Sequence, residues 1–370
     1  MRRSPALAHL TQTIVELCRS GLEPAALRDR VLPRLRRAVP FDAAFWTTVD
    51  PLTLLFTAPH QEEIPPETVP YFLENEFGAD DVNRFAELAR DAIGVRTLVQ
   101  ATGGAMESSP RYRDIFRPLG LGDELRAVLR SGDVCWGGLC LHRDAGAPFT
   151  PDEVDYVRRL APRLAEGIRA GLLGASIEAS DPGDAPGLVV LDGEGALLSV
   201  TEAGRRWLAA LGAPDVERFG VPAALAGLVA PLRGPPPADD APLPRLRTRT
   251  LAGRWAVLHA SRLPGAGTDA VAVIIDEPSP SELAPVLMMA YGLTGQERTV
   301  TSLVCRGLAT REIAESLRIS PHTVQDHLKA VFEKTGVRSR RELVTTILHE
   351  QYLPRVMSGG RVGPGGFFAG

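Results

Sequence analysis

Residues 310–335 read TREIAESLRISPHTVQDHLKAVFEKT, and this stretch decides the fold of the C-terminal part of the chain. Apolar residues recur at helical spacing on both sides of Arg318 and Ile319, which predicts two short helices joined by a tight turn. Ser320 and Pro321 are typical of a helix N-cap and of the first residue that follows it. The stretch therefore predicts a helix-turn-helix.

The second helix of this motif is expected to have an inner and an outer face. Val324, Leu328 and Val331 share one apolar stripe, which we expect to point inward. The opposite face carries Asp326 and Lys329, with further polar residues beside them. The carboxylate of Asp326 can accept a hydrogen bond from a cytosine amino group, or it can pair with Lys329 three residues on. Both interpretations stay open.

The distribution of charge separates the C-terminal segment from the rest of the chain. The 370 residues hold 41 basic and 45 acidic side chains. Residues 291–370 carry 11 basic and 7 acidic residues, a net charge of +4, so the remainder has a net charge of −8. Such a basic segment favours a nucleic-acid partner.

Lysine is nearly absent, and this excludes several classes of enzyme. Lys329 and Lys334 are the two lysines of the chain, and both lie on the predicted second helix. A nucleotide-binding P-loop, a pyridoxal enzyme and a protein kinase each need a lysine in a specific context that neither provides. The first 328 residues also lack the lysine of a phosphoacceptor receiver domain.

Four spaced runs carry a specific resemblance. They are Leu-Thr-x-x-Glu from Leu293, Gly-Leu-Ala-Thr-Arg-Glu-Ile-Ala from Gly307, Leu-x-Ile-Ser-x-x-Thr-Val-x-x-His from Leu317, and Lys-x-Gly-Val-x-Ser-Arg-x-x-Leu from Lys334. Together they closely resemble the LuxR-type helix-turn-helix, over about sixty residues. The resemblance implies a four-helix domain whose third helix enters the major groove of double-stranded DNA, usually as a homodimer.

The same resemblance implies roles for individual residues. The positions at which members of the family read bases correspond here to Gln325, Asp326 and Lys329. Those that would contact phosphates are Thr310, Arg311, Ser320, His322, Thr323 and Lys334.

The rest of the chain predicts two further domains, so the fold class is α+β with two antiparallel-sheet sensor-type domains before the helical one. Residues 1–176 resemble a GAF-like domain, and residues 186–277 resemble a PAS-like domain. The helix-turn-helix domain is expected at 285–352, and residues 353–370, rich in glycine, are expected to form a disordered tail.

Several elements can be predicted within the first domain. Residues 43–49 and 52–57 are expected to pair as a hairpin, as are residues 124–130 and 134–142. A long helix is expected from Thr150 to about Leu173. Its apolar stripe at Leu160, Leu164 and Ile168 is expected to pair two subunits.

The candidates for a ligand or metal site in this domain are weaker. Trp46, Tyr112, Phe116 and Trp136 could line a small-molecule pocket, although aromatic residues are more often part of a core. Cys135 and Cys140 lie five positions apart on a predicted strand, which puts them on opposite faces and disfavours a metal pair. His142 and His259 are isolated on predicted strands; each could be a haem or metal ligand, but a core or surface histidine is favoured, so no metal site is expected. The acidic pairs Asp80–Asp81 and Asp123–Glu124 are expected to be solvated.

These observations predict a cytoplasmic, dimeric, DNA-binding transcription regulator that is not an enzyme. Its N-terminal domains would sense a ligand or partner, and no cofactor can be named. The sequence has no evident signal peptide and no charge-free run long enough to span a membrane. The alternative is a ligand-binding or protein-interaction module in which the helix-turn-helix serves dimerisation.

Overall fold

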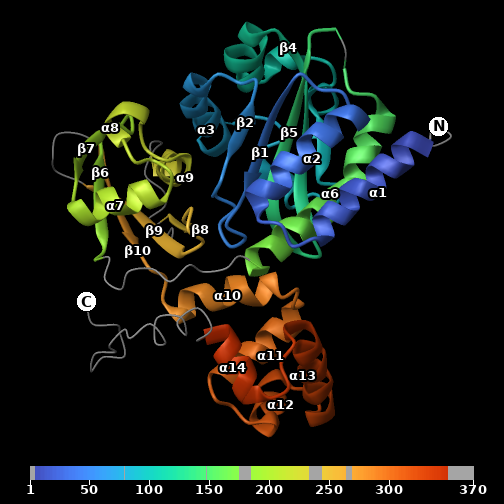
Figure 1. Ribbon diagram of the computed structural model, residues 1–370, viewed down its shortest axis with the longest axis vertical. Coiled ribbons are helices and arrows are strands. Elements are labelled where there is room, and N and C mark those ends of the chain that lie inside the picture. The colour runs from blue at the N-terminus through green and yellow to red at the C-terminus, as the bar shows by residue number, and fades with distance from the viewer. Residues whose placement is uncertain are drawn as a thin grey trace. The chain divides into compact units, whose positions relative to one another are not determined.

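The computed structural model describes residues 5–78, 80–146, 148–174, 185–232, 244–263 and 269–348. The chain forms two compact units, one of residues 1–175 with 186–276 and one of residues 176–185 with 277–370 (Figure 1). The first unit holds both predicted sheet segments, and the second holds the predicted helix-turn-helix. The predicted tail, 353–370, lies outside the described residues.

The first unit contains an antiparallel sheet with the strand order β2-β1-β5-β4-β3. Its strands are β1 (Ala43–Thr48), β2 (His60–Glu62), β3 (Val95–Thr97), β4 (Leu121–Ser131) and β5 (Val134–Asp144). The predicted β4–β5 hairpin is confirmed. The hairpin predicted between 43–49 and 52–57 is present in part. Residues 50–54 form the turn, in which the carbonyl of Asp50 accepts hydrogen bonds from the amides of Thr53 and Leu54. Phe56 then forms an antiparallel bridge with Val49, and the regular pairing strand is β2 at residues 60–62.

Helices cover both faces of this sheet. A side chain at Gly137 of β5 would meet Ile168 of α6 (Pro151–Gly174), whereas one at the next position, Gly138, would meet Phe85 of α4 (Phe85–Leu88). Consecutive strand residues point to opposite faces, so α6 and α4 lie on opposite sides. The helices α1 (Pro5–Arg19) and α2 (Pro24–Ala38) pack against α6 (Figure 1).

The face that carries α4 is covered by short helical segments. They are α3 (Val69–Phe77), the π-helix η3 (Tyr112–Phe116) and η4 (Arg117–Leu119), whose apolar residues belong to or pack against the buried cluster of Phe85. The other short helices of this region are η1 (Pro66–Thr68), α5 (Leu98–Thr102) and η2 (Met106–Ser108).

The stripe on α6 that was expected to pair subunits packs inside the unit instead. Leu160, Leu164 and Ile168 are at most 3% exposed, and α6 packs against β4 and β5. The prediction that these three residues join two subunits is therefore wrong, because a five-stranded sheet needs an apolar cover on each face.

A β-bulge corrects the expected placement of two cysteines. Gly137 of β5 pairs with Leu129 of β4, but the next pair is Cys135 with Arg130, so Trp136 has no partner residue in β4. The extra residue shifts the alternation of the strand by one position. Cys135 and Cys140 therefore belong to the same buried cluster, and the prediction that they lie on opposite faces is wrong.

A second antiparallel sheet completes the first unit. Its strands are β6 (Gly187–Leu191), β7 (Leu197–Val200), β8 (Arg245–Arg249), β9 (Trp255–Leu263) and β10 (Ala270–Asp276). Its order, β7-β6-β10-β9-β8, repeats that of the first sheet when each is counted from its own first strand. The predicted fold class, two antiparallel sheets followed by a helical domain, is confirmed.

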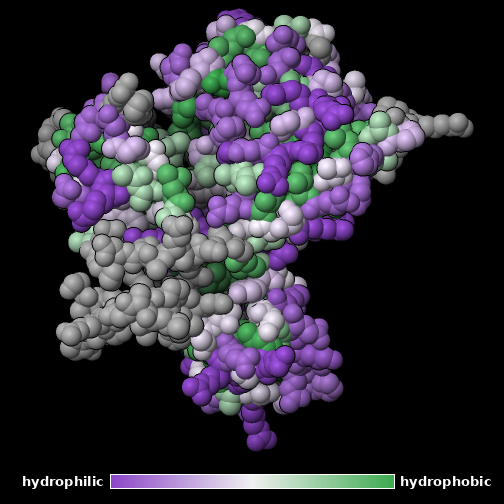
Figure 2. Space-filling model, in the orientation of Figure 1, coloured by the Kyte–Doolittle hydropathy of each residue, from purple (hydrophilic) through white to green (hydrophobic). Residues whose placement is uncertain are grey.

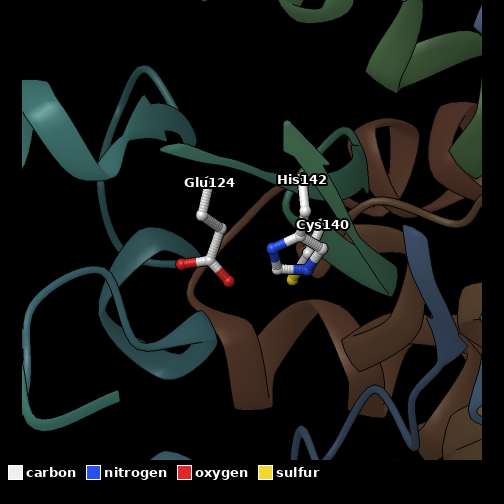
Figure 3. Close-up of side chains that lie close together, drawn as sticks. All are labelled: Glu124, Cys140 and His142. Carbon is white, nitrogen blue, oxygen red and sulfur yellow. The ribbon is translucent and has the colours of Figure 1, made fainter. Parts of the chain in front are cut away.

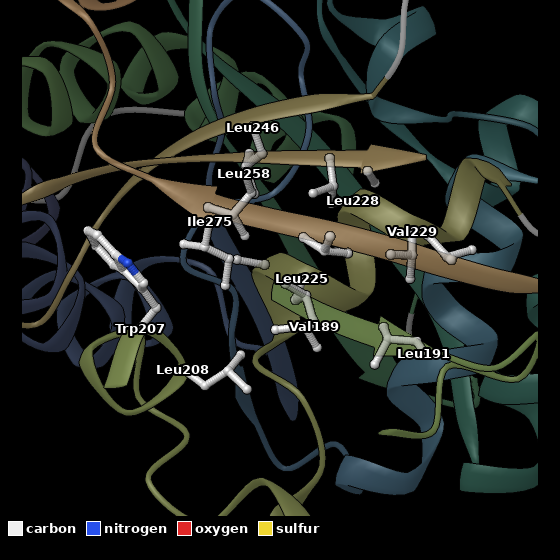
Figure 4. Packing of buried hydrophobic residues seen from close by; sticks show 14 of the residues in the cluster. Val189, Leu191, Trp207, Leu208, Leu225, Leu228, Val229, Leu246, Leu258 and Ile275 are labelled. Atoms are coloured by element: carbon white, nitrogen blue, oxygen red, sulfur yellow. The ribbon is translucent and has the colours of Figure 1, made fainter. Parts of the chain in front are cut away.

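The second sheet packs against helices that follow β7, and a buried ion pair ties it to the first sheet. The helical segments are α7 (Glu202–Ala210), α8 (Val216–Phe219), α9 (Ala223–Val229) and η5 (Ala230–Leu232). Their core with the sheet includes Trp207, Leu225 and Ile275 (Figure 4). The Asp50 carboxylate, just after β1, accepts bonds of 2.9 Å from both the backbone N and Nη1 of Arg247 in β8.

The second unit is helical. Its helices are α10 (Pro280–Ala290), α11 (Gly295–Cys305), α12 (Thr310–Leu317), α13 (Pro321–Thr335) and α14 (Arg340–Leu348). Their common core confirms the predicted inward residues of α13, which join Val300, Ile313 and Leu343. Among the described residues, no helix combines the length and apolar character needed to cross a bilayer.

Candidate nucleic-acid interface

A three-residue turn sets the angle between α12 and α13. Arg318 adopts the left-handed conformation (φ 56°, ψ 42°), which is uncommon for a residue other than glycine. The amide of Ile319 donates to the carbonyl of Ala314 at 3.0 Å, which closes the end of α12. Ser320 then begins α13, and its Oγ accepts a bond of 3.0 Å from the amide of Thr323. The predicted cap and turn are confirmed.

The face of α13 opposite the core is polar and exposed. Val324 and Val331 are fully buried, and Leu328 is nearly so, which fixes the rotation of the helix about its axis. Gln325, Asp326 and Lys329 are all exposed on its outer side. The space-filling view shows a largely hydrophilic surface over this part of the second unit (Figure 2).

Five of the six residues with predicted phosphate roles lie at two helix starts. Thr310 and Arg311 open α12, and the first turn of α13 holds His322 and Thr323 after the Ser320 cap. Arg311 and His322 are exposed. Thr310 is half-buried, and its Oγ1 accepts a bond of 3.3 Å from Arg340 of α14. A helix start offers free amides and a partial positive charge, which suit a phosphate group.

Asp326 has a partner one turn earlier in α13. Its Oδ2 lies 3.3 Å from Nδ1 of His322, and the two side chains are 68% and 83% exposed. The pair is ionic only when the imidazole is protonated. The structure thus places Asp326 beside His322 rather than in an ion pair with Lys329, whose ammonium has no ion-pair partner among the described residues.

Lys334 is engaged within the fold. Its Nζ donates to Oε2 of Glu297 at 2.6 Å, and the same carboxylate oxygen accepts a bond of 2.7 Å from the amide of Thr294, the N-cap of α11. Burial opposes ionisation of Glu297, but the bonds from Lys334 and Thr294 outweigh it and lower the pKa of the carboxyl below its usual 4.5. The ion pair therefore ties α13 to the start of α11.

The four aromatic residues expected to line a ligand pocket do not gather at one place. Tyr112 and Phe116 pack in the buried cluster on the α4 side of the first sheet, together with Phe45 of β1. Trp46 follows Phe45 and so points to the opposite face. Trp136, at the bulge, is fully buried.

The core of the first unit holds a network of charged side chains that sequence reasoning missed. Arg111 bonds to Glu124 at 2.9 Å and lies 3.4 Å from Asp81. Arg126 bonds to Glu124 at 2.9 Å and to Glu76 at 2.6 Å. Burial disfavours the charged form of Glu124, but the two guanidinium groups outweigh it and lower the pKa of this carboxyl to about 2.

Both acidic pairs that were expected to be solvated lie partly or wholly in the core. Asp81 is 7% exposed, Asp123 is 3% exposed and Glu124 is fully buried, so the prediction is wrong for these three residues. It is confirmed for Asp80. Burial of Asp81 and Glu124 depends on the buried Arg111 and Arg126, which give each of these carboxylates an opposite charge. The Asp123 carboxylate instead accepts hydrogen bonds from backbone amides, and the amide of Phe149 donates to its Oδ2 at 3.0 Å.

The five helices and the capped turn define a helix-turn-helix domain of the DNA-binding type. The sequence pattern described as "GerE: Bacterial regulatory proteins, luxR family" matches residues 292–347. The chain is 39% identical over 56 residues to the spore germination protein GerE of Bacillus subtilis, a match that covers 15% of this chain and 76% of GerE. The chain belongs to the LuxR family of bacterial regulatory proteins, as the sequence motifs predicted.

Other similarities cover smaller parts of the proteins compared. The chain is 50% identical over 52 residues to the putative HTH-type transcriptional regulator Mb0914c of Mycobacterium bovis. That match spans 14% of this chain and 6% of the mycobacterial protein. Among solved structures, the GAF domain of a phosphoenolpyruvate-protein phosphotransferase from Coxiella burnetii aligns with 45% of this chain and 95% of its own, with 18% identity and a TM-score of 0.33.

Proposed function

We propose that this protein is a one-component transcription regulator that binds double-stranded DNA in a sequence-specific manner. The observation that carries the proposal is the orientation of α13. The buried residues Val324, Leu328 and Val331 hold one side of the helix in the core, and the other side presents Gln325, Asp326 and Lys329 to a partner. A helix of this kind fits the major groove, where amide and ammonium groups read base edges.

Electrostatics support a phosphate contact at the two helix starts. Residues 291–370 carry a net charge of +4 against −8 in the rest of the chain. The exposed Arg311 and His322 flank the free amides at the beginnings of α12 and α13. Contacts of this type position the domain on the duplex without reading its sequence. We therefore assign base reading to the outer face of α13 and anchoring to these starts.

The proposal includes a homodimer and a sensing role for the first unit. One domain of this size makes few base contacts, and a pair on two-fold-related half-sites gains affinity through avidity. The stripe of Leu160, Leu164 and Ile168 on α6 is buried in the first unit, so a different surface joins the two subunits. The first unit would respond to a small molecule or a partner and alter the placement of the two recognition helices. A regulator of this kind acts in the cytoplasm, where bacterial DNA lies.

The direct test is selection of DNA by the full chain. The protein is incubated with a random duplex library at low and at near-physiological salt, and the bound DNA is sequenced over several rounds. We expect enrichment of a two-fold-related sequence and binding that weakens steeply as salt rises. A library that stays random, with no salt-dependent binding, would support the alternative of a module that uses these helices for dimerisation alone.

A further inference from the structure

Two adjacent strands place three metal-binding side chain types together in the core of the first unit. Glu124 of β4 pairs directly with His142 of β5, and Arg126 of β4 pairs with Cys140 of β5. These four residues therefore form a square on one face of the sheet. A carboxylate oxygen of Glu124, Sγ of Cys140 and a ring nitrogen of His142 all lie within 4.8 Å of one another (Figure 3).

We propose that Glu124, Cys140 and His142 bind a divalent transition-metal ion of the zinc type. A thiolate, an imidazole and a carboxylate are the three donor types that Zn²⁺ and its neighbours in the first transition row accept from proteins. The site is separate from the helix-turn-helix, and the proposal does not depend on DNA binding. It departs from the expectation of no metal site, which considered Cys135 and Cys140 as the ligand pair.

Hydrogen bonds leave the ring nitrogens of His142 and one acceptor position of the Glu124 carboxylate able to bind a metal ion. His142 is fully buried, yet neither ring nitrogen has a hydrogen-bond partner among the described residues. Buried polar atoms normally have a partner, so both ring nitrogens are open to water or to an ion. Glu124 accepts one bond at Oε1 from Arg126 and two at Oε2 from Arg111. An ionised carboxylate has about four acceptor positions, so one remains.

Charge balance also favours a cation here. The ion-paired network holds three carboxylates, Glu76, Asp81 and Glu124, against the two guanidinium groups of Arg111 and Arg126. It therefore has one excess negative charge in a buried environment, which is unfavourable. When a divalent ion binds and the Cys140 thiol releases its proton, the network gains one positive charge and becomes neutral. The arginines then act as hydrogen-bond donors that orient the Glu124 ligand.

The geometry needs only a small adjustment. Bonds of about 2.0–2.3 Å to a four-coordinate ion put neighbouring donor atoms roughly 3.5 Å apart. The three donor atoms now lie within 4.8 Å of one another. Side-chain movements of about an ångström therefore bring them to the separation of roughly 3.5 Å that a bound ion requires. Phe116 of the π-helix η3 packs on the His142 ring with 4.5 Å between centroids, so η3 covers the site. Three protein ligands leave one position for water or another small donor.

The experiment uses the full chain and Co²⁺ as a spectroscopic substitute for Zn²⁺. The protein is treated with a chelator, dialysed and titrated with each metal, and bound zinc is counted per chain by elemental analysis. Cobalt bound through a thiolate adds a charge-transfer absorption in the near ultraviolet. Cys140→Ser tests the site, and Cys135→Ser is the matched control, because it makes the same change at another buried cysteine of the same strand and cluster. Circular dichroism checks that both variants fold.

We expect one zinc per chain and a cobalt–thiolate band in the parent and in Cys135→Ser, with the band lost in Cys140→Ser. X-ray absorption of the parent should show one sulfur and at least two nitrogen or oxygen donors, a result that needs no variant to fold. Absence of stoichiometric metal from the parent after reconstitution would overturn the proposal. A band that persists in Cys140→Ser or disappears in Cys135→Ser would also overturn it.

Discussion

At the scale of single residues, the two lysines of the chain have different environments. Lys329 is exposed on the outer face of α13, and its ammonium has no ion-pair partner among the described residues. Lys334, five residues on, is 35% exposed and bonded to the nearly buried Glu297. The resemblance to known family members assigned both to DNA. The structure gives the two lysines different surroundings, since Lys334 pairs with Glu297, whereas Lys329 has no such pair among the described residues; both DNA roles stay predictions.

The first prediction concerns Lys329→Ala. Loss of a direct ammonium contact should weaken binding to the selected operator by about 1–3 kcal/mol and relax the preference at one base position. The measurement is a titration of the parent and the variant against the operator and its single-base variants at fixed salt. Arg306→Ala, an exposed cation at the end of α11, is the control for general charge loss. Equal operator affinity of parent and Lys329→Ala would show that this face does not read DNA.

The second prediction is a pH dependence carried by Glu297. The folded-state pKa of Glu297 is lower than its ordinary value of 4.5, so the carboxylate stabilises the second unit. This contribution is present above pH 4.5 and is lost as the pH falls through the lower folded-state pKa. Urea unfolding of a second-unit fragment at several pH values should therefore show stability that falls in acid.

Two variants identify the groups responsible for this acid sensitivity. Glu297→Gln should flatten the decline, and Lys334→Met should lower the free energy of unfolding near neutral pH by on the order of 1 kcal/mol. Glu333→Gln, at an exposed position beside Lys334, is the matched control and should leave the curve unchanged. An acid decline that Glu297→Gln does not alter would assign the effect to other carboxyl groups.

At the scale of elements, the start of α13 combines a structural and a binding role. The Ser320 hydroxyl satisfies the Thr323 amide at 3.0 Å, and the two hydroxyls lie 2.9 Å apart. Pro321 follows the cap and needs no amide partner. The left-handed Arg318 directly before this cap turns the chain within three residues. The direction of the recognition helix therefore depends on a few local interactions.

The third prediction tests the cap. Ser320→Ala should destabilise the second unit by about 1 kcal/mol, because the Thr323 amide loses its acceptor at the end of a helix. Ser316→Ala is the control, since it makes the same substitution inside the neighbouring helix α12, where alanine has the higher helix propensity. Thermal unfolding of the two variants should give a lower midpoint for Ser320→Ala alone. A similar decrease in both would mean that the cap has no special effect.

At the scale of the whole molecule, the chain consists of two units with separate cores. The core of the second unit includes Ala284 and Met288 of α10 as well as residues of the four helices that follow. α10 itself starts with a capping box formed by Ser279 and Glu282. The first unit joins two sheets of the same strand order in one compact body. Separate cores predict that the second unit can fold without the first.

The fourth prediction is a fragment that folds alone but binds weakly. Residues 277–353 should fold, because they keep the Ser279 cap and the full apolar core, and they should bind DNA as a monomer. The full chain should bind the same operator more tightly, with half-sites about one helical turn apart. Sedimentation and footprinting of both proteins measure this difference. A monomeric full chain, or a fragment that binds as tightly as the parent, would contradict the claim that residues 1–276 supply the dimer.

Features that depend on neighbours along the chain could be predicted from the sequence. The cap at Ser320 and the inward stripe of α13 follow from local hydrogen bonding and helical periodicity, and both are present in the structure. The β4–β5 hairpin follows from alternation around a short turn. The family motifs are of the same kind, since they lie within sixty consecutive residues.

Features that depend on residues far apart in the sequence became visible in the folded chain alone. Asp81 and Glu76 are charged residues that a sequence places at the surface. Arg111 and Arg126, which lie 30 and 50 positions further along the chain, make their burial tolerable. The one-residue bulge at Trp136 puts Cys135 and Cys140 in the same buried cluster, and no pattern among neighbouring residues predicts this bulge. Folding also brings Glu297 within 2.6 Å of Lys334, a pairing that no local pattern predicts. Long-range pairing of charges and strands is therefore what sequence patterns leave undetermined in this protein.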